Sequence, residues 1–376
     1  EIMDEYWSDP FNLHLVTGLG PTRNPFDDQP VLRNHALRNF RDLLHASAKS
    51  GAMVFYLDNF LNESVAPNEN YARELMELHT LGVDGGYTET DVKEVARCFT
   101  GWSLRFPGDP GGAYGEFVFV PGIHDDLGKL VLGNPIAPGG GQTDGEQVLD
   151  MLVAHPSTAS FIATKLCRRF ISDSPPRSAI DAVAAAFTAS NGDIKDCLRA
   201  LFETPEFLDH ADLKFTRPSE YLAALVRALA PDTPYPPAND QFLFFAQSIL
   251  GQLPFYWATP DGYPDVQSYW ASTGGMLNRW RLSFLSFAGI IPGVNVIQVD
   301  YTAMLNGADT LASVIDAIID AVAMRPLSSV DRGIIMDWLK DEYAITEDQV
   351  LPSGVPEQVS ALVAAVLVSS VYFHLR

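Results

Sequence analysis

The chain has few basic residues, few cysteines and no long apolar run. Its 376 residues include 25 Lys and Arg against 47 Asp and Glu, a formal net charge of −22. Nucleic acids and anionic membrane surfaces are bound by positively charged surfaces, so this balance argues against both as partners. No stretch approaches the ~20 apolar residues of a membrane-spanning helix, so no transmembrane segment is expected. The start lacks a basic region followed by an apolar run, so no signal peptide is expected in it.

Several familiar motifs are also absent. The three cysteines cannot form a closed disulfide framework and none has a CxxC partner. Cys98, Cys167 and Cys197 lie in helical patterns among apolar neighbours, which predicts buried free thiols. There is no GxSxG elbow, no GK[ST] after the glycines at 139–141, no HExxH and no EF-hand loop. Serine catalysis and nucleotide binding are therefore disfavoured, and no cofactor or bound metal is predicted.

The composition is that of a globular protein, with 47% hydrophobic and 19% charged residues. The length allows one large domain or two lobes that share an interface. A proline-rich connection at 230–240 is the best candidate for a boundary. We expect a main helical domain at residues 1–230 and a C-terminal helical lobe, 241–376, packed on it.

Residues 67–102 hold the densest run of polar functional side chains. An apolar stripe at helical spacing precedes Gly82, where a helix-ending glycine is expected; the stripe is Tyr71, Leu75 and Leu78. Thr88 followed by Asp91 is typical of a capping box that starts a second helix. Because the connection is short, the pattern predicts an antiparallel αα-hairpin that brings Glu77 and His79 near Asp91.

The other patterns predict a mainly α, multi-helix globular fold with a small β-hairpin insertion near residues 104–135. The whole irregular insertion is expected to cover residues 104–142. The insertion is indicated by glycine and proline at 107–115 and by the aromatic, β-branched run 117–120. A helix is expected from Val31 to Ser50, ended by Gly51. Further helices are expected to start at Thr143 and Pro156, and to cover about 273–287, 308–323, 327–341 and 357–371.

Three segments carry a resemblance: NYARELMELHTLGVDGGYTETDV at 70–92, FVFVPGIHDDLGKLVLG at 117–133 and TPDGYP at 259–264. With them, nearly the whole chain resembles the large bacterial family named only as domain of unknown function 1800. The resemblance implies a mainly helical fold and frequent export from the cytoplasm, and it brings no settled activity. Family members often carry Asn-His where this chain has Asp9-Pro10, so a histidine-dependent activity would not carry over at that point.

A polar stripe lies beside the apolar one. Asn70, Arg73, Glu74 and Glu77 fall at i, i+3, i+4 and i+7. Two carboxylates in different surroundings can divide acid and base or nucleophile roles, and glycoside hydrolysis uses such a pair roughly 5–10 Å apart. Glu74 and Glu77 are our catalytic candidates, with Asp91 as a third. The alternative is a solvated helix face in which Arg73 and Glu77 form an exposed ion pair.

Other side chains are candidates for positioning a substrate. Arg73 and Asn70 lie on the stripe, His79 follows it, and His124 and Asp125 lie in the insertion. The two histidines and the glutamates could instead hold a metal ion, although their spacing matches no known motif. A turn role for His124 and Asp125 also remains open. Aromatic rings gather in the irregular segments and suit the apolar face of a sugar; the candidates are Trp102, Trp257 and Tyr263.

The sequence thus favours a secreted or cell-envelope hydrolase of the glycosidase type that acts on a polysaccharide or oligosaccharide. A non-catalytic envelope protein that binds a glycan or a protein is the alternative from another class. A metal-dependent hydrolase is the third. Oligomeric state, glycan and linkage are not indicated by any pattern.

Overall fold

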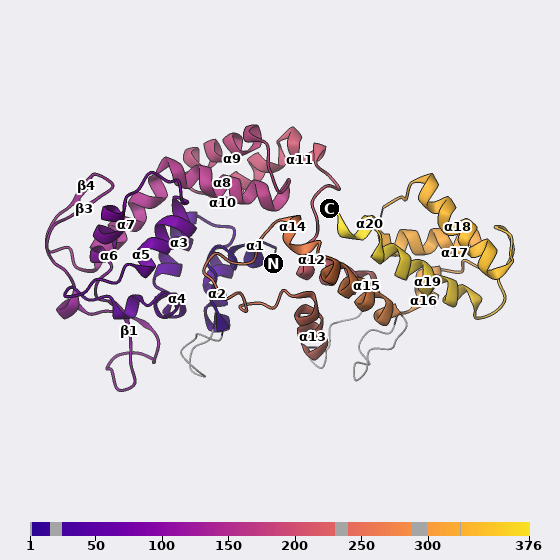
Figure 1. The fold of residues 1–376 in the computed structure, drawn as a ribbon, viewed down its shortest axis with the longest axis horizontal. Coiled ribbons are helices and arrows are strands. Elements are labelled where there is room, and N and C mark those ends of the chain that lie inside the picture. Colours follow the sequence, from indigo (N-terminus) through magenta and orange to yellow (C-terminus); the bar gives the residue numbers. More distant parts are fainter. Residues whose placement is uncertain (1, 16–24, 230–239, 288–298, 324) are drawn as a thin grey trace. The chain divides into compact units, whose positions relative to one another are not determined.

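The computed structural model describes residues 2–15, 25–229, 240–287, 299–323 and 325–376 (Figure 1). The chain forms two compact units. The first is Glu1–His210 with Pro254–Pro264, and the second is Ala211–Leu253 with Asp265–Arg376. The expected boundary at 230–240 lies outside the described residues except for Asp240. The fold is mainly α, as the sequence predicts.

The first unit is built from helices α1 to α11. Their bounds are α1 (Ile2–Trp7), α2 (Pro25–His35), α3 (Phe40–Ala48), α4 (Gly51–Tyr56), a 3₁₀ turn (Asn59–Leu61), α5 (Asn70–Glu74), a π-helical turn (Leu75–Thr80), α6 (Glu89–Cys98), α7 (Gln142–Ala154), α8 (Pro156–Phe170), α9 (Arg177–Ala189), α10 (Ile194–Phe202) and α11 (Pro205–Asp209). Its core includes Trp7, Phe40, Leu75 and Phe99, each wholly buried. The three cysteines are free and buried, as predicted, and burial raises the pKa of each thiol to about 12.

The β insertion consists of two small antiparallel sheets within the described residues. β1 (Trp102–Leu104) pairs with β2 (Phe117–Phe119), and β3 (Lys129–Val131) pairs with β4 (Asn134–Ile136). β1 is buried at all three positions, and β3 buries Lys129 and Val131 while Leu130 is exposed. β3 packs on α6, so the insertion is fixed to the central hairpin.

The ends of the central hairpin follow the sequence signals. Gly82 takes a left-handed φ of 79°, and a Cβ there would lie 2.9 Å from the Phe161 ring. The Thr88 hydroxyl accepts from the Asp91 amide at 3.3 Å, and the Asp91 carboxylate accepts from the Thr88 amide at 2.9 Å. This is the predicted capping box, so both helix boundaries are confirmed.

The single helix predicted from Val31 to Ser50 is wrong. α2 ends at His35, Asn39 caps α3 by accepting from the Arg41 amide at 2.8 Å, and Ser50 caps α4. Gly51 therefore begins a helix instead of ending one. Asn and Ser satisfy the free amides of a first helical turn, which explains both breaks. The apolar positions were still correct, since Leu32, Ala36, Phe40, Leu43 and Leu44 are all buried.

In its described residues the second unit consists of helices and loops, and its β structure is limited to isolated bridges. Its helices are α12 (Pro218–Leu229), α13 (Asp240–Leu250), α14 (Gln267–Trp270), α15 (Thr273–Phe287), α16 (Tyr301–Leu305), α17 (Leu311–Ile318), a π-helical turn (Ile319–Ala323), α18 (Ser329–Tyr343), α19 (Val355–Ser369) and α20 (Val371–His374). α19 packs on α15 and α17, and its Val359, Val363 and Leu367 are buried in the core of this unit. The four helices expected beyond residue 270 correspond to α15, α17 with its π-helical turn, α18 and α19.

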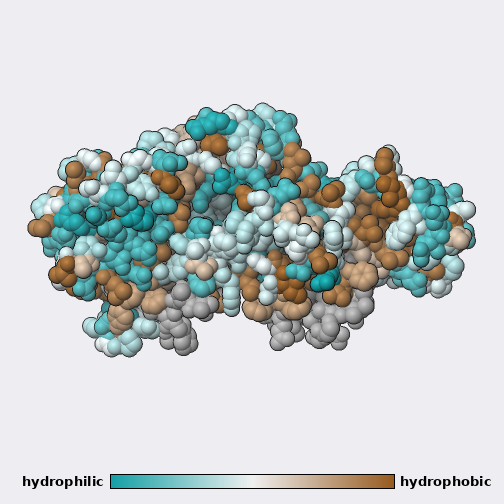
Figure 2. Space-filling view, in the orientation of Figure 1, coloured by the Kyte–Doolittle hydropathy of each residue, from teal (hydrophilic) through white to brown (hydrophobic). Residues whose placement is uncertain are grey.

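The surface of the second unit carries apolar side chains (Figure 2). On α13 and α15 they include Phe244, Phe245, Trp280 and Phe284, which are between 46% and 59% exposed. Among the described helices of the whole chain, none combines the length and the apolar character needed to cross a bilayer.

The capping box gives a test of this fold. Thr88→Ala removes the hydroxyl that accepts from Asp91, so we expect the free energy of unfolding to fall by about 1 kcal/mol. Urea denaturation followed by circular dichroism measures this. Thr188→Ala, at an exposed position inside α9, is the matched control and should change stability by less than about 0.5 kcal/mol. Equal losses in both variants would contradict a capping role.

Candidate active site

The candidate site is built on the helical segment that carries the polar stripe. α5 (Asn70–Glu74) continues directly into the π-helical turn Leu75–Thr80, where the Thr80 hydroxyl donates to the Leu75 carbonyl at 2.7 Å. π-helical turns are rare and occur disproportionately at functional sites. The sequence did not predict this turn, because an apolar stripe has nearly the same spacing in an α-helix. It begins directly after the carboxylate of Glu74.

Glu74 is a half-buried carboxyl group that makes no hydrogen bond or ion pair with any described residue. Burial raises its pKa, and the negative charges of Glu77 and Asp261 add to that shift. Arg73 acts in the opposite direction but does not cancel the shift. A carboxyl group in such surroundings holds its proton to higher pH than an exposed one, which is what a general acid requires.

Glu77 lies one turn further along the same segment and is also half-buried. Its Oε2 accepts from the Tyr87 hydroxyl at 3.4 Å, a long hydrogen bond. Burial raises the pKa of Tyr87, and the charge of Glu77 contributes to that shift, so the phenol stays protonated and can donate. The two glutamates are electrostatically coupled, since Glu77 raises the pKa of Glu74.

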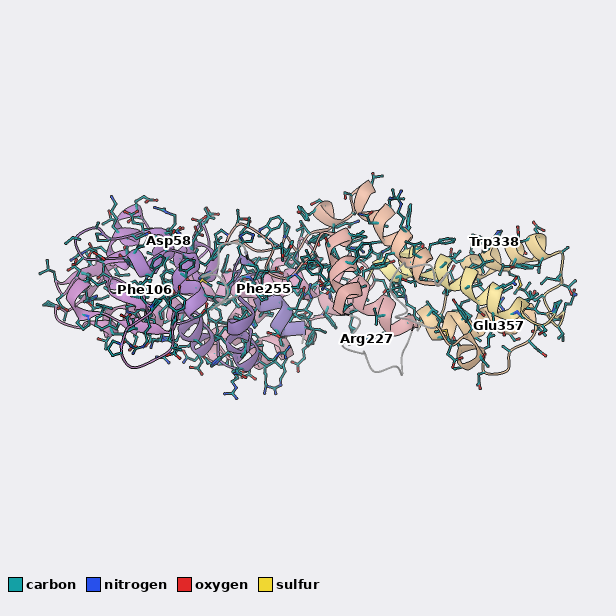
Figure 3. All side chains as sticks on the ribbon, turned by 90° about the horizontal axis from the view of Figure 1, so that it is seen from below. Asp58, Phe106, Arg227, Phe255, Trp338 and Glu357 are labelled. Atoms are coloured by element: carbon teal, nitrogen blue, oxygen red, sulfur yellow. The ribbon has the colours of Figure 1, made fainter. Side chains whose placement is uncertain are left out.

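The segment Pro254–Pro264 packs on the first unit and completes the site. One buried amide holds it: Asn12 Nδ2 donates to the Trp257 carbonyl at 2.9 Å and to the Thr259 carbonyl at 2.7 Å. Phe255 is buried in the core of the first unit (Figure 3). Gly262 has a φ of 73°, and a Cβ there would lie 2.3 Å from the Asp9 carbonyl oxygen. Only glycine allows this approach.

Asp261 is the charged group that this segment contributes. Its Oδ1 accepts from Trp257 Nε1 at 2.9 Å and from the Thr259 hydroxyl at 2.5 Å, so its carboxylate is fixed. Tyr56 lies beside the same segment and donates to the Ala258 carbonyl at 2.9 Å. Burial raises the pKa of Tyr56 to about 12, and the charges of Glu74 and Asp261 contribute. Tyr56, Glu74 and Asp261 therefore lie within electrostatic reach of one another.

Lys165 is the cation of this neighbourhood. Its Nζ lies 4.9 Å from the centre of the Phe161 ring and makes no hydrogen bond or ion pair with the described residues. Burial lowers its pKa to about 8, and the nearby charges of Asp9 and Asp261 only partly oppose this. An amine that titrates near neutrality can exchange protons with a substrate.

Arg73 is not available to a substrate in the way the sequence suggested. Its guanidinium binds Glu89 through two nitrogens at 2.7 Å and Glu69 at 3.2 Å. The exposed ion pair with Glu77, which was the alternative to a catalytic stripe, is not formed. The Asn70 side-chain amide makes no hydrogen bond with described residues and lies one turn before Glu74. Asn70 is thus the stripe's free polar side chain beside the two glutamates.

Asp91 and Asp125 lie in closed networks. Asp91 accepts from Thr88 with one oxygen and from the Leu132 amide at 2.8 Å with the other. Asp125 binds Arg97 at 2.7 Å and accepts from the Leu127 amide at 3.0 Å. These hydrogen bonds lower the pKa of both carboxylates despite partial burial. No contact joins Asp91 to Glu77 or His79, so the expected proximity did not produce an interaction.

His79 and Trp102 are buried. The His79 ring packs on Phe11 with centroids 4.9 Å apart, and burial lowers its pKa to about 3, with a further contribution from the charge of Lys165. Trp102 is wholly buried between Phe99 and Phe117. Both side chains therefore face the core, and neither presents a surface to a ligand in this structure.

The remaining candidates divide between the insertion and the 254–264 segment. His124 is buried and bonds Thr100 and Asp144. Trp257 and Tyr263 are partly exposed, with ring centroids 5.0 Å apart, and lie on the segment that carries Asp261. In the described part of the chain, no group of three or more His, Cys, Asp or Glu side chains is placed to hold a metal ion.

The sequence reasoning therefore proposed Glu74, Glu77 and Asn70 as candidates and did not propose Lys165, Asp261 or Tyr56. Lys165 lies in an ordinary amphipathic helix, and no local pattern distinguishes it. Asp261 stands in the TPDGYP segment, which was noticed for its aromatic residues only. The proximity of Asp261 to Glu74 and to Lys165 depends on tertiary packing across more than about ninety residues of sequence, which spacing does not reveal.

The lowered pKa of Lys165 predicts a pH dependence of stability. The folded value is about 8 and an unfolded lysine titrates near ~10.4, so between these values the unfolded chain binds more protons. Stability should therefore increase as pH rises through that interval. Lys165→Met should remove the increase, which urea denaturation across the interval measures. Lys93→Met, at an exposed position, is the control. An unchanged slope in Lys165→Met would contradict the burial of the amine.

Comparison with known proteins identifies a family without naming an activity. No curated protein and no solved structure matches the chain. The model of one family covers almost all of it, and it includes the 70–92, 117–133 and 259–264 segments. With residues 1–374 matched, the chain belongs to the family described as protein of unknown function DUF1800.

Proposed function

We propose that this protein is a hydrolase of the glycosidase type that acts on a polysaccharide. The observation that carries the proposal is Glu74, a half-buried carboxyl group with a raised pKa and no bonding partner among the described residues. Structural carboxylates are ordinarily paired when they are buried, because an unpaired charge is costly to desolvate. An unpaired one beside other titratable groups is typical of a catalytic acid.

In this proposal Glu74 is the general acid. Its proton passes to the glycosidic oxygen as the bond to the sugar ring breaks. Asp261 or Glu77 is the second carboxylate, and it either activates a water or attacks the sugar carbon. Asp261 suits the role of second carboxylate, because the Trp257 indole and the Thr259 hydroxyl donate to it and fix its position. The separation of the acting pair would decide between inversion and retention.

The substrate class rests on the side chains around these carboxylates. Trp257 and Tyr263 offer ring faces on the same segment as Asp261. Sugars stack their apolar face on such rings and bond their hydroxyl groups to polar neighbours. Asn70, one helical turn before Glu74, and Tyr56, whose pKa the charges of Glu74 and Asp261 raise, are uncharged polar groups of this neighbourhood. Location outside the cytoplasm is part of the proposal and rests on frequent export in the family.

A binding protein without catalysis is the second candidate, and a different observation favours it. Arg73, Asp91, His124 and Asp125 are all engaged by other residues of the chain. Closed networks of this kind stabilise a surface without leaving groups free for chemistry. In that case Glu74 would accept hydrogen bonds from a ligand and transfer no proton.

The proposal is tested on a panel of polysaccharides, scored by new reducing ends and by chain length, with and without divalent metal. We expect cleavage of at least one glycan without added metal. Glu74→Gln should lower turnover by about 10²–10⁴-fold, because the amide has no acidic proton. Asp261→Asn and Glu77→Gln then identify the second carboxylate, since only the acting one should cause a comparable loss.

The control is Glu63→Gln, which removes an exposed carboxylate and should leave turnover unchanged. Full activity of a folded Glu74→Gln variant would contradict the assigned acid. Activity only with added metal would favour the metal-dependent hydrolase. Glycan binding without cleavage in every condition would favour the binding protein.

A further inference from the structure

A second set of titratable groups lies in the interior of the first unit. The β insertion supplies His124 and Lys129, and the first turn of α7 supplies Asp144. Their side chains are 1%, 0% and 0% exposed. Lys129 Nζ lies 2.6 Å from Asp144 Oδ2, and His124 Nε2 lies 3.3 Å from the same oxygen. An amine, an imidazole and a carboxyl group thus meet at one atom out of reach of water.

The other oxygen of this carboxyl group has no partner. Asp144 Oδ1 is buried and makes no hydrogen bond within the described residues. The Gly140 backbone closes over it, since a Cβ on Gly140 would lie 1.9 Å away. An ionised carboxylate spreads its charge over both oxygens, so leaving one unpaired in the interior is unfavourable. The carbonyl oxygen of an uncharged acid or amide tolerates the same position better.

The hydrogen bonds of His124 point to the same protonation state. Its Nδ1 lies 2.7 Å from the Thr100 carbonyl oxygen, which only accepts, so Nδ1 carries a proton. In the neutral ring Nε2 is then an acceptor, and the proton between it and Asp144 must come from the acid. The alternative is an ionised Asp144 beside an imidazolium and an ammonium, with the exposed Asp126 carboxylate 3.9 Å from His124 Nε2; it still leaves the charge on Asp144 Oδ1 buried and unpaired within the described residues. The uncharged arrangement removes that unpaired charge and leaves an acid facing an amine.

We propose that Lys129 and Asp144 are joined by an intramolecular isopeptide bond. The Lys129 Nζ lone pair attacks Asp144 Cγ, and the N–C bond forms as the Cγ–Oδ2 bond breaks. His124 Nε2 accepts a proton from Nζ and delivers one to the departing Oδ2, which leaves as water. The ion pair and the amide plus water contain the same atoms and carry the same net charge. Oδ1 remains as the amide carbonyl oxygen.

The fold holds the two partners in place for this reaction. Lys129 begins β3 opposite Ile136, and its Nζ also donates to the Asp125 carbonyl. Phe119 packs on the His124 ring with centroids 5.4 Å apart, which fixes the imidazole. Groups held about 3–3.5 Å apart in a rigid, dry site react far faster than free molecules do. A nitrogen 2.6 Å from a carboxyl oxygen is within that reach of its carbon.

The first measurement is the mass of the denatured full chain by electrospray mass spectrometry. We expect a mass lower than that of the sequence by one water. Because trypsin does not cut after an acylated lysine, the Lys129–Leu130 bond should also stay intact. Chymotrypsin cuts after Leu130 and Leu132, between the linked residues, and should release a branched peptide containing residues 129 and 144.

A matched pair within the same unit serves as the control. Lys49 Nζ lies 2.6 Å from Glu146 Oε1, the same separation as the buried pair, but these side chains are 32% and 31% exposed. Water reaches both of these side chains, unlike the buried pair, so no branched peptide should link residues 49 and 146. A link there would contradict the role of burial.

Three variants locate the reaction. Lys129→Met should restore the full mass, whereas Asp144→Asn should lose ammonia in place of water. His124→Gln should leave most chains unlinked, because the proton carrier is removed. A water loss that persists in Lys129→Met would be a succinimide at the Asp144-Gly145 sequence and would overturn the proposal. So would a wild-type chain of full mass, which shows an ion pair only, whether or not the variants fold.

Discussion

Two hydrogen bonds from one buried amide connect distant parts of the first unit. Asn12 donates to the carbonyl oxygens of Trp257 and Thr259, and this holds residues 254–264 against the start of the chain. The close approach of Gly262 to Asp9 fixes the same segment a few residues later. Through these contacts the charge of Asp261 acts on Glu74 and Lys165. The electrostatics of the candidate site thus depend on the packing of a segment far away in sequence.

The site combines an acid and an amine whose pKa values are both shifted for one physical reason, which is burial without pairing. The pKa of Glu74 is raised and the pKa of Lys165 is lowered. Neither side chain has a hydrogen-bond or ion-pair partner among the described residues. Arg73, on the same helix, is instead paired, because its guanidinium forms ion pairs with Glu69 and Glu89. Neighbouring positions on one stripe therefore differ in charge pairing because their tertiary partners differ.

Local signals in the sequence predicted local structure well. The Thr88–Asp91 capping box and the turn at Gly82 were correct because each depends on residues within one helical turn. The same capping chemistry explains the error at Val31–Ser50. The apolar pattern alone predicted one continuous helix there, but Asn39 and Ser50 each cap the start of a new helix. Lys165 and Asp261 were missed because their surroundings are set by chain segments far apart, which a single sequence does not place together.

The central claim is that Glu74 is a desolvated, unpaired carboxyl group, and its titration tests this most directly. Carbon-detected NMR of protein labelled at the glutamate carboxyl carbons follows each pKa, and Glu74→Gln identifies the resonance. We predict a midpoint above that of exposed glutamates, which moves down in Asp261→Asn because a nearby negative charge is removed. A midpoint at the ordinary value near ~4.3, unchanged by Asp261→Asn, would contradict the account.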